Sequence, residues 1–253
     1  MKALAFRYLV GAACMTCVGW GAPGGGKGFV VDFTQCTEFA GVGPVDLAKA
    51  SALVPPVFTT QPAGTTAAIV VRATSCGDVS VNGGRPVPTI ISQIGVEIVP
   101  PDGTGDINNY TLIYLSNNPE LVLAFNRAGV PAALDPDLKY EFTYDSSGTA
   151  GELYVEADAF NLPAYFLTGT ETDPSGAGSD FKANWWFATP REIVKQASDF
   201  PDIAFGTSNI SLHTTRTGML GKLIGGNTDS DFHFLPVRGV YASAHMQVTV
   251  ATN

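Results

Sequence analysis

The sequence has few charged residues, and fewer basic residues than acidic ones. Only 15% of its 253 residues are charged, and 14 lysines and arginines against 23 acids give a net charge of −9. The basic residues are scattered singly, whereas nucleic-acid binding depends on clustered lysine and arginine. The composition therefore excludes a nucleic-acid-binding protein. A hydrophobic content of 45% also excludes a disordered chain.

Long apolar runs are absent except near the N-terminus. Residues 8–18 form an apolar stretch that follows Lys2 and Arg7 and precedes small residues up to Ala22. This pattern is typical of a secretory signal. A single membrane anchor is the alternative, but the run is shorter than the ~20 apolar residues that cross a bilayer. We expect an exported protein, secreted or periplasmic, that leaves the membrane after signal removal. The predicted segments are a signal peptide (1–22), a glycine-rich linker (23–28) and a β-barrel domain (29–253).

Cysteine and histidine are also scarce, with four and three residues respectively. Cys14 and Cys17 lie within the predicted signal, so Cys36 and Cys76 remain in a chain that would fold in an oxidising compartment. We therefore predict a Cys36–Cys76 disulfide. The spacing of the cysteines and histidines matches no metal-site pattern. We expect neither a metal nor another cofactor.

Glycine, proline and β-branched residues are abundant, and they favour a β-rich fold with many turns. Short helices are expected at residues 44–53, which Pro55 and Pro56 follow, and at residues 119–128, which Gly129 ends. The pattern favours one all-β or α+β domain, a closed or nearly closed antiparallel β-barrel with two or three short helices. Strands are expected at residues 29–33, 66–74, 89–99, 110–115, 140–144, 151–157, 165–172, 183–187, 208–214 and 237–250.

Three ordered stretches resemble the acetoacetate decarboxylase superfamily. Residues 53–55 (Leu-Val-Pro) precede a strand, as the family's Val-Pro-x-x-Leu entry does. Residues 110–119 and 129–134 flank a helix, similar to the family's Asn-x-Pro helix start and its central Tyr-Pro-Lys-Lys-Leu segment. Residues 235–244 (Leu-Pro-Val-Arg-Gly-Val-Tyr-Ala-Ser-Ala) are similar to its closing strand. The resemblance implies the same barrel fold, in a divergent member.

The resemblance also implies what chemistry has been lost. The family's decarboxylation needs a lysine amine that forms a Schiff base with a keto acid. Ala132 and Ala133 stand at the matching positions, so we expect no Schiff base. The strand at residues 90–96, which matches the family's acid-bearing strand, contains no acid, although Glu97 follows it. Lys139 is the nearest lysine that could replace the missing amine, by an unusual rearrangement.

Polar side chains within apolar strands are the candidate ligand-binding residues. Arg72 interrupts an apolar strand, where a charge needs a partner or water. Gln93 lies in the stretch that faces the cavity in the resembling family, and Arg238 occupies its basic position, where it would clamp a carboxylate or support the fold. Tyr114 lies beside the matched segments. Of the adjacent pair Trp185–Trp186, one indole should point inward and one outward.

Two functions use the interior of the barrel, and a third possibility is a filled barrel whose role lies on its outer surface. In the first, the barrel binds a small, largely apolar organic molecule in its interior, with Gln93, Tyr114, Arg238 and Arg72 around its polar end. In the second, the same cavity carries out a lysine-independent lyase, isomerase or cyclase reaction on a small keto or carboxylate substrate. An Asp231–His233 pair is an acid–base candidate, and residues 102–108 form a polar turn that could suggest calcium. The sequence indicates neither the ligand nor the oligomeric state.

Overall fold

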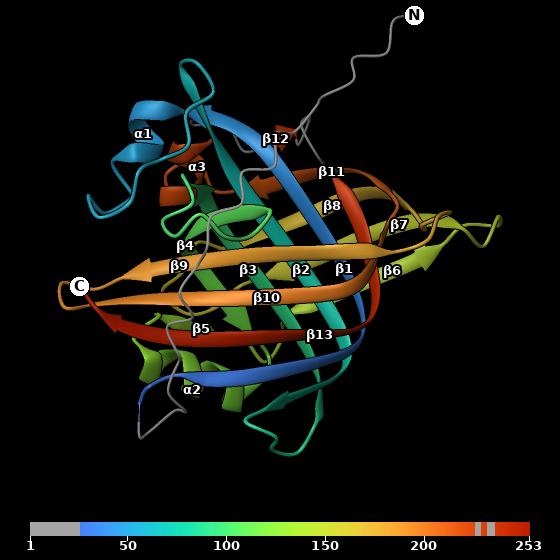
Figure 1. Ribbon diagram of the computed structural model, residues 1–253. Helices are drawn as coiled ribbons and strands as arrows, with labels where there is room; N and C mark the ends of the chain where they lie inside the picture. Colours follow the sequence, from blue (N-terminus) through green and yellow to red (C-terminus); the bar gives the residue numbers. More distant parts are fainter. Residues whose placement is uncertain (1–25, 226–228, 232–235) are drawn as a thin grey trace, which may run out of the picture.

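The computed structural model describes residues 26–225, 229–231 and 236–253. The predicted signal and the first half of the predicted linker, residues 23–25, lie outside these residues. The described chain is mostly β-structure (Figure 1). The strands are β1 (Phe29–Asp46), β2 (Thr66–Val81), β3 (Val87–Glu97), β4 (Ile107–Ser116), β5 (Ala132–Leu134), β6 (Lys139–Tyr144), β7 (Ala150–Ala157), β8 (Tyr165–Thr172), β9 (Ser179–Ala188), β10 (Glu192–Phe205), β11 (Thr207–Thr214), β12 (Asp229–Asp231) and β13 (Val237–Thr252). The helices are α1 (Leu47–Ser51), α2 (Pro119–Ala128) and α3 (Met219–Leu223).

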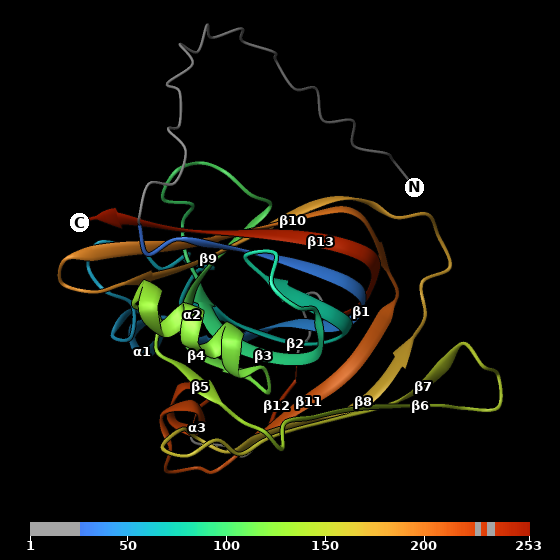
Figure 2. The same ribbon diagram turned by 90° about the horizontal axis from the view of Figure 1, so that it is seen from below.

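The larger sheet closes into a ring. Its strand order is β3-β2-β1-β13-β10-β9-β4-β5, and an additional pairing of β3 with β4 joins the two sides. Figure 2 looks along this ring, with β10 and β13 on one side and β2 and β3 on the other. The pairs are antiparallel except where β4 meets β9, and short β5 adds to β4 in parallel. The predicted closed antiparallel β fold is confirmed, except that the β4–β9 pair of the ring is parallel.

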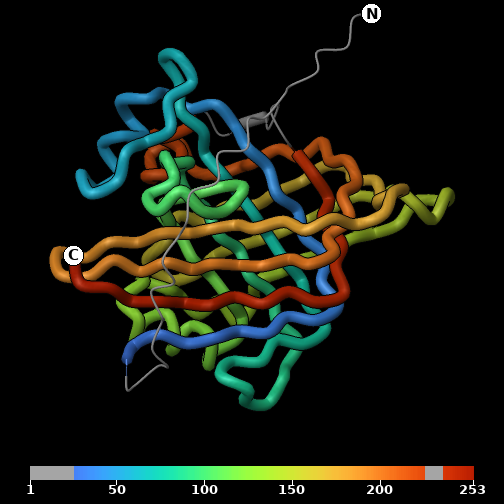
Figure 3. The backbone as a smooth tube through the Cα atoms, viewed as in Figure 1, coloured from blue at the N-terminus to red at the C-terminus, as the bar shows by residue number. Residues whose placement is uncertain are grey.

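The first strand bends along its length, so that its two halves run in different directions (Figure 3). At Gln35 the backbone has a φ of 53°, in the left-handed region, which strains a non-glycine residue. Next to it, Cys36 lies opposite Cys76 of β2 in the strand register, with a Cα–Cα distance of 4.1 Å. The two cysteines form the disulfide that the sequence predicts. This cross-link holds β1 and β2 together at the bend.

A second sheet of five strands, in the order β12-β11-β8-β7-β6, packs against the outside of the ring. Side chains alternate along each ring strand, so the ring strands contribute to two separate cores. The inner core includes Val31, Tyr114 and Val248. The outer core lies between the two sheets and includes Ile94 of the ring and Leu167 of β8.

Helix α2 closes off part of the ring. Asn118 caps its start by accepting hydrogen bonds from the backbone N–H groups of Glu120 and Leu121, and Gly129 ends it with a φ of 95°. Its bounds are those expected from the sequence. Its buried face joins the inner core, since the Phe125 ring lies 5.0 Å from that of Phe29. Figure 1 shows the helix at the lower end of the ring.

The helix expected at residues 44–53 is shorter than predicted. Residues 44–46 continue β1, and Asp46 caps α1 by accepting a hydrogen bond from the Lys49 N–H. Residues 44–46 adopt a strand and not a helix because their backbone pairs with β2, up to Asp46 opposite Thr66. Ladder hydrogen bonds therefore override the helical spacing of the apolar residues here.

Candidate ligand cavity

A cavity of about 300 Å³, partly open to solvent, lies on the inner face of the ring. Strands β1, β2, β4, β9, β10 and β13 all contribute to its wall. Most of the wall is apolar, because inward positions on these strands carry aliphatic and aromatic side chains. Wall residues of this kind include Val42, Val70, Ile107, Trp185, Ile203 and Val237. The two tryptophans divide as predicted, since Trp185 lines the cavity and Trp186 packs in the outer core.

A series of aromatic rings runs inward from the surface along the cavity. It begins at Phe205, whose exposed fraction is 41%. The ring of Phe181 lies 5.7 Å from Phe205 and 6.1 Å from Phe200, and Phe200 lies 5.0 Å from Tyr241. Such edge-on and tilted contacts are favourable aromatic geometries. Phe205, Phe181 and Phe200 line the cavity and give an apolar molecule an aromatic surface that starts at solvent, while Tyr241 contacts Phe200 without being one of the wall residues.

The buried end of the cavity is polar. Here Glu38 of β1 and Arg72 of β2 form an ion pair in which Nη2 and Oε2 are 3.4 Å apart. The Thr74 hydroxyl donates to Oε2 of Glu38 at 2.6 Å, and the Tyr241 hydroxyl donates to the same oxygen at 3.4 Å. We call these four residues the floor cluster. Glu38 and Arg72 are the only charged residues that line the cavity within the described part of the chain.

Burial and charge fix the protonation of this floor cluster. Burial acts to lower the pKa of Arg72, but the Glu38 carboxylate, with Tyr241 and Tyr114 beyond it, raises the pKa above its ordinary value. Burial, followed by the nearby Glu38 carboxylate, raises the pKa of Tyr241 well above its ordinary value. Arg72 is therefore a cation and Tyr241 a neutral hydroxyl at physiological pH.

Three of the four sequence-predicted ligand residues lie in one row across the ring. The strand register places Gln93 of β3 opposite both Arg72 of β2 and Tyr114 of β4. All three side chains are buried. Gln93 donates to the Thr111 hydroxyl at 3.0 Å and to Oε1 of Gln196 at 3.3 Å. Of the row, Arg72 lines the cavity, while Gln93 and Tyr114 lie beside it in the inner layer.

The fourth predicted residue, Arg238, lies apart from this row. It pairs with Phe39 in the strand register, which puts it on the outer face of the ring, between the two sheets. Its Nη1 lies 2.8 Å from Oε2 of Glu171, and its Nε lies 2.7 Å from Oδ1 of Asp173. The guanidinium carbon also lies 3.8 Å from the centre of the Phe142 ring. Arg238 therefore joins the ring to the second sheet.

Several buried polar atoms near the cavity have no hydrogen-bond partner within the described residues. Nε of Arg72 and Nε1 of Trp185 are both in this group, and both residues line the cavity. The side-chain amide of Asn109, opposite Trp185 in the register of β4 and β9, is unpartnered at both its nitrogen and its oxygen. Buried polar groups are normally paired, so such atoms call for an explanation.

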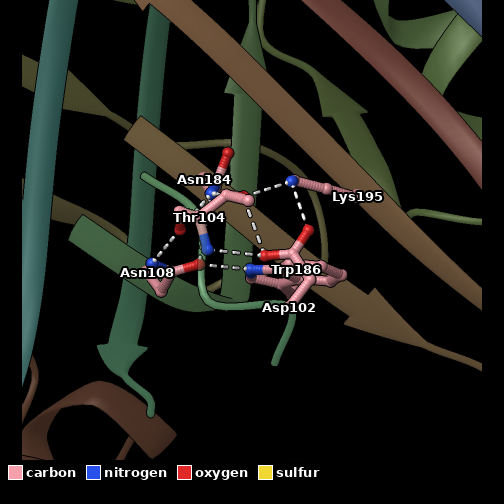
Figure 4. Close-up of polar contacts among 6 residues, drawn as sticks. All are labelled: Asp102, Thr104, Asn108, Asn184, Trp186 and Lys195. Atoms are coloured by element: carbon pink, nitrogen blue, oxygen red, sulfur yellow. Dashed lines mark hydrogen bonds and ion pairs between the residues drawn. The ribbon is translucent and has the colours of Figure 1, made fainter. Parts of the chain in front are cut away.

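The turn that could have suggested calcium instead holds a lysine. Figure 4 shows Lys195 of β10 reaching Oδ2 of Asp102 at 2.6 Å and the Thr104 hydroxyl at 2.8 Å. Asn108 accepts a hydrogen bond from the Trp186 indole at 2.9 Å. These contacts tie the loop between β3 and β4 to the outer face of β9 and β10. We therefore assign this polar cluster a structural role.

Other residues considered from the sequence lie away from the cavity or outside the described residues. Lys139 is exposed and pairs with Glu156 at 2.6 Å. Ala132 lies in β5, where it is opposite Tyr114 in the parallel register. Burial raises the pKa of the half-buried Glu97. The side chains of the Asp231–His233 pair lie outside the described residues.

The sequence interpretation missed Glu38 and Tyr241. It ended the first strand at residue 33, and so Glu38 was not seen as a charge inside a strand. The sequence did contain a pattern that could have identified Glu38. It lies two positions from Cys36, so in an extended chain the two side chains share one face. Tyr241 lies in the matched closing strand, among several apolar residues. Nothing in the sequence around it indicates that its hydroxyl contacts Glu38.

Comparison with known proteins identifies the fold. No protein-family model and no curated protein matches the sequence. Solved structures do match. They include an acetoacetate decarboxylase with a TM-score of 0.57 and 14% identity, covering 88% of each chain. Another is acetoacetate decarboxylase from Legionella pneumophila, with a TM-score of 0.55, 12% identity, and coverage of 88% of this chain and 86% of that one.

A third match is the enduracididine biosynthesis enzyme MppR, solved with the condensation product of pyruvate and imidazole 4-carboxaldehyde. Its TM-score is 0.56 at 10% identity, and the match covers 89% of this chain and 88% of that chain. Among the described residues, no helix has the length and apolar character needed to span a membrane. The resemblance carried by the three sequence stretches is thus confirmed in three dimensions: the chain has the acetoacetate decarboxylase fold.

Proposed function

We propose that this protein binds a small, largely apolar organic molecule inside its ring of strands. The observation that carries the proposal is the cavity of about 300 Å³, apolar along most of its wall and polar only at its buried end. Ligand pockets of proteins have this character, with hydrophobic walls and a few polar groups that fix orientation. Arg72, with Glu38 beside it, would hold the polar end of the ligand. Gln93 and Tyr114 would support Arg72 from the same row.

Binding without Schiff-base chemistry is part of the proposal. The wall residues include no lysine within the described part of the chain. Ala132 and Ala133 stand where the resemblance would place the reactive amines. A Schiff base needs an uncharged amine at the site, and neither alanine provides one.

A cavity-filling variant tests the proposal. A Cβ added at Gly239 would lie 3.1 Å from Cδ1 of Ile203 and 3.7 Å from Cβ of Glu38, so Gly239→Val places methyl groups in the cavity. Gly176→Val is the matched control, because no atom lies within 4 Å of a Cβ there. Each protein is incubated with host culture extract, and the retained small molecules are identified by untargeted mass spectrometry.

We expect the wild type and Gly176→Val to retain one compound unchanged, at about one equivalent for a single site. Gly239→Val should retain far less of it. Retention of nothing by the wild type, or equal retention by Gly239→Val, would contradict the proposal. Circular dichroism of both variants checks that they are folded.

A second candidate function is a lysine-independent lyase or isomerase reaction in the same cavity. The observation in its favour is that Tyr241 and Glu38, a protonated hydroxyl and a carboxylate, lie within 3.4 Å of each other at the polar end. Such a pair is able to donate and accept a proton. In the same experiment, depletion of a compound far beyond one equivalent, with a new product, would establish the enzyme. Tyr241→Phe should then abolish turnover and leave binding in place.

We also propose that the protein is exported. The Cys36–Cys76 disulfide supports this, because disulfides persist in oxidising compartments. The apolar run at residues 8–18 has the features of a signal. Cell fractionation and the intact mass of the protein test the idea. We expect an extracytoplasmic protein that begins near residue 23, and a full-length cytoplasmic protein would contradict it.

A further inference from the structure

The floor cluster also indicates which polar group the ligand carries. We infer that the ligand of the cavity has a neutral hydrogen-bond acceptor, a ketone, ester or amide carbonyl, and not a carboxylate. This inference rests on the proposed binding function and specifies the class of molecule that would be bound.

The Arg72 guanidinium has more N–H donors than the hydrogen bonds it makes. The Arg72 guanidinium makes one hydrogen bond within the described residues, from Nη2 to the Thr74 hydroxyl at 3.3 Å. Its Nε is buried without a partner, and so is Nε1 of Trp185. Guanidinium and indole N–H groups donate only. Arg72 lines the cavity and its guanidinium carries five N–H groups, so an acceptor on the ligand would take N–H groups that the described residues leave unpaired.

The charge of the floor cluster is already balanced. Oε2 of Glu38 lies 3.4 Å from Nη2 of Arg72 and also accepts the Thr74 and Tyr241 hydroxyls. A ligand carboxylate at Arg72 would lie beside the Glu38 carboxylate, with no second cation on the described wall to compensate it. Burying a charge without a partner is unfavourable, and two nearby like charges repel. A carbonyl oxygen accepts the same N–H groups without either cost.

Apolar residues surround this polar end on every strand that lines the cavity. The rest of the ligand is therefore a hydrocarbon or aromatic body, which would pack along the series from Phe205 to Phe200. An amphiphile with one neutral carbonyl at its end matches both the wall and the floor cluster.

Three probes of equal chain length test the inference: methyl hexyl ketone, octanoate and octane. Their dissociation constants for the disulfide-bonded protein are measured at pH 7 by isothermal titration and by ligand-observed NMR. We expect the ketone to bind about tenfold more tightly than octanoate and more tightly than octane. Octanoate binding as tightly as the ketone would overturn the inference, and this comparison needs no variant.

Two variants test the role of the floor cluster, with Glu152→Gln on the exposed face of β7 as the control. In Arg72→Met the ketone should lose its advantage over octane. In Glu38→Gln the guanidinium loses its counter-charge, so octanoate should gain about tenfold relative to the ketone. Unchanged selectivity in a folded Glu38→Gln protein would overturn the charge argument.

The same experiment separates the inference from the proposed function. Octanoate bound as tightly as the ketone, with both lost in Gly239→Val, would overturn the carbonyl preference and leave the cavity as a binding site. No binding of any probe to the wild type, or equal binding to Gly239→Val, would overturn binding in the cavity itself.

Discussion

Removal of Arg238 should destabilise the protein strongly without affecting ligand binding. Arg238 and Glu171 are both almost fully buried, with exposed fractions of 2% and 1%. Among the described residues, Arg238→Met leaves the Glu171 carboxylate with one hydrogen-bond donor, the Ser208 hydroxyl at 2.9 Å. Breaking one side of a buried ion pair costs about 3–5 kcal/mol, since the remaining charge stays buried. The second partner, Asp173, is more exposed and contributes about 0–1 kcal/mol.

Equilibrium unfolding in urea measures this loss as a change in the free energy of unfolding. Small domains have about 5–15 kcal/mol in total, so the variant should unfold at a much lower urea concentration. The double variant Arg238→Met/Glu171→Met removes both charges, and it should recover most of the loss. A loss below about 1 kcal/mol for the single variant, or no recovery in the double variant, would refute the reasoning. At urea-free conditions the folded single variant should retain ligand as the wild type does, unlike Arg72→Met.

The remaining predictions concern a cross-link, a carboxyl group and a glycine. Replacing Cys36 and Cys76 by alanine opens a loop with a separation of 40 residues, which should lower the free energy of unfolding by about 4 kcal/mol in urea titrations. Because burial raises the pKa of Glu97, the folded state holds its proton more tightly than the unfolded state, and stability falls as pH rises through the pKa values of this group. Glu97→Gln should remove that fall, so its melting temperature should exceed that of the wild type at pH 7 more than at pH 4. Gly95→Ala should prevent normal packing, since its Cβ would clash with the backbone oxygen of Tyr110, and a variant with the wild-type melting temperature would contradict this.

The sequence pattern was sufficient where local signals agreed with tertiary structure. Helix α2 was predicted with its observed bounds because Pro119 and Gly129 mark its ends. The Cys36–Cys76 disulfide followed from composition and compartment alone. The fold resemblance followed from the order of three short stretches, none of which is specific by itself.

Strand β10 was missed for a physical reason. Its inward positions include Gln196 and Ser198, which are buried in the polar part of the ring interior, so the strand lacks an alternating apolar pattern. Pro201 lies where the register with β9 shifts, between Phe200 and Ile203. A proline is tolerated at such a bulge but argues against a strand when only the sequence is seen.

The candidate site was predicted in part. Arg72 was chosen because a charge in an apolar strand needs a partner, and Gln93 and Tyr114 were chosen from their places in the resemblance. The structure puts these three residues in one row. Glu38 was not predicted as the partner of Arg72. The two residues meet only because β1 pairs with β2 in one particular register, which the sequence does not reveal. Arg238 faces the other side of the ring for a similar reason, since a single-residue change in register reverses every side chain of a strand.

The pairing of β1 with β13 has a consequence for how the molecule assembles. The first strand of the ring lies beside β13, with Phe29 opposite Val248, so the ring stays open until β13 has been synthesised. Before then, β1 and β10 present unpaired edges, which are prone to aggregation. Contacts between such distant residues also slow folding. Because Val237 and Gly239 of β13 line the cavity, the ligand site comes into existence only when this last strand is in place.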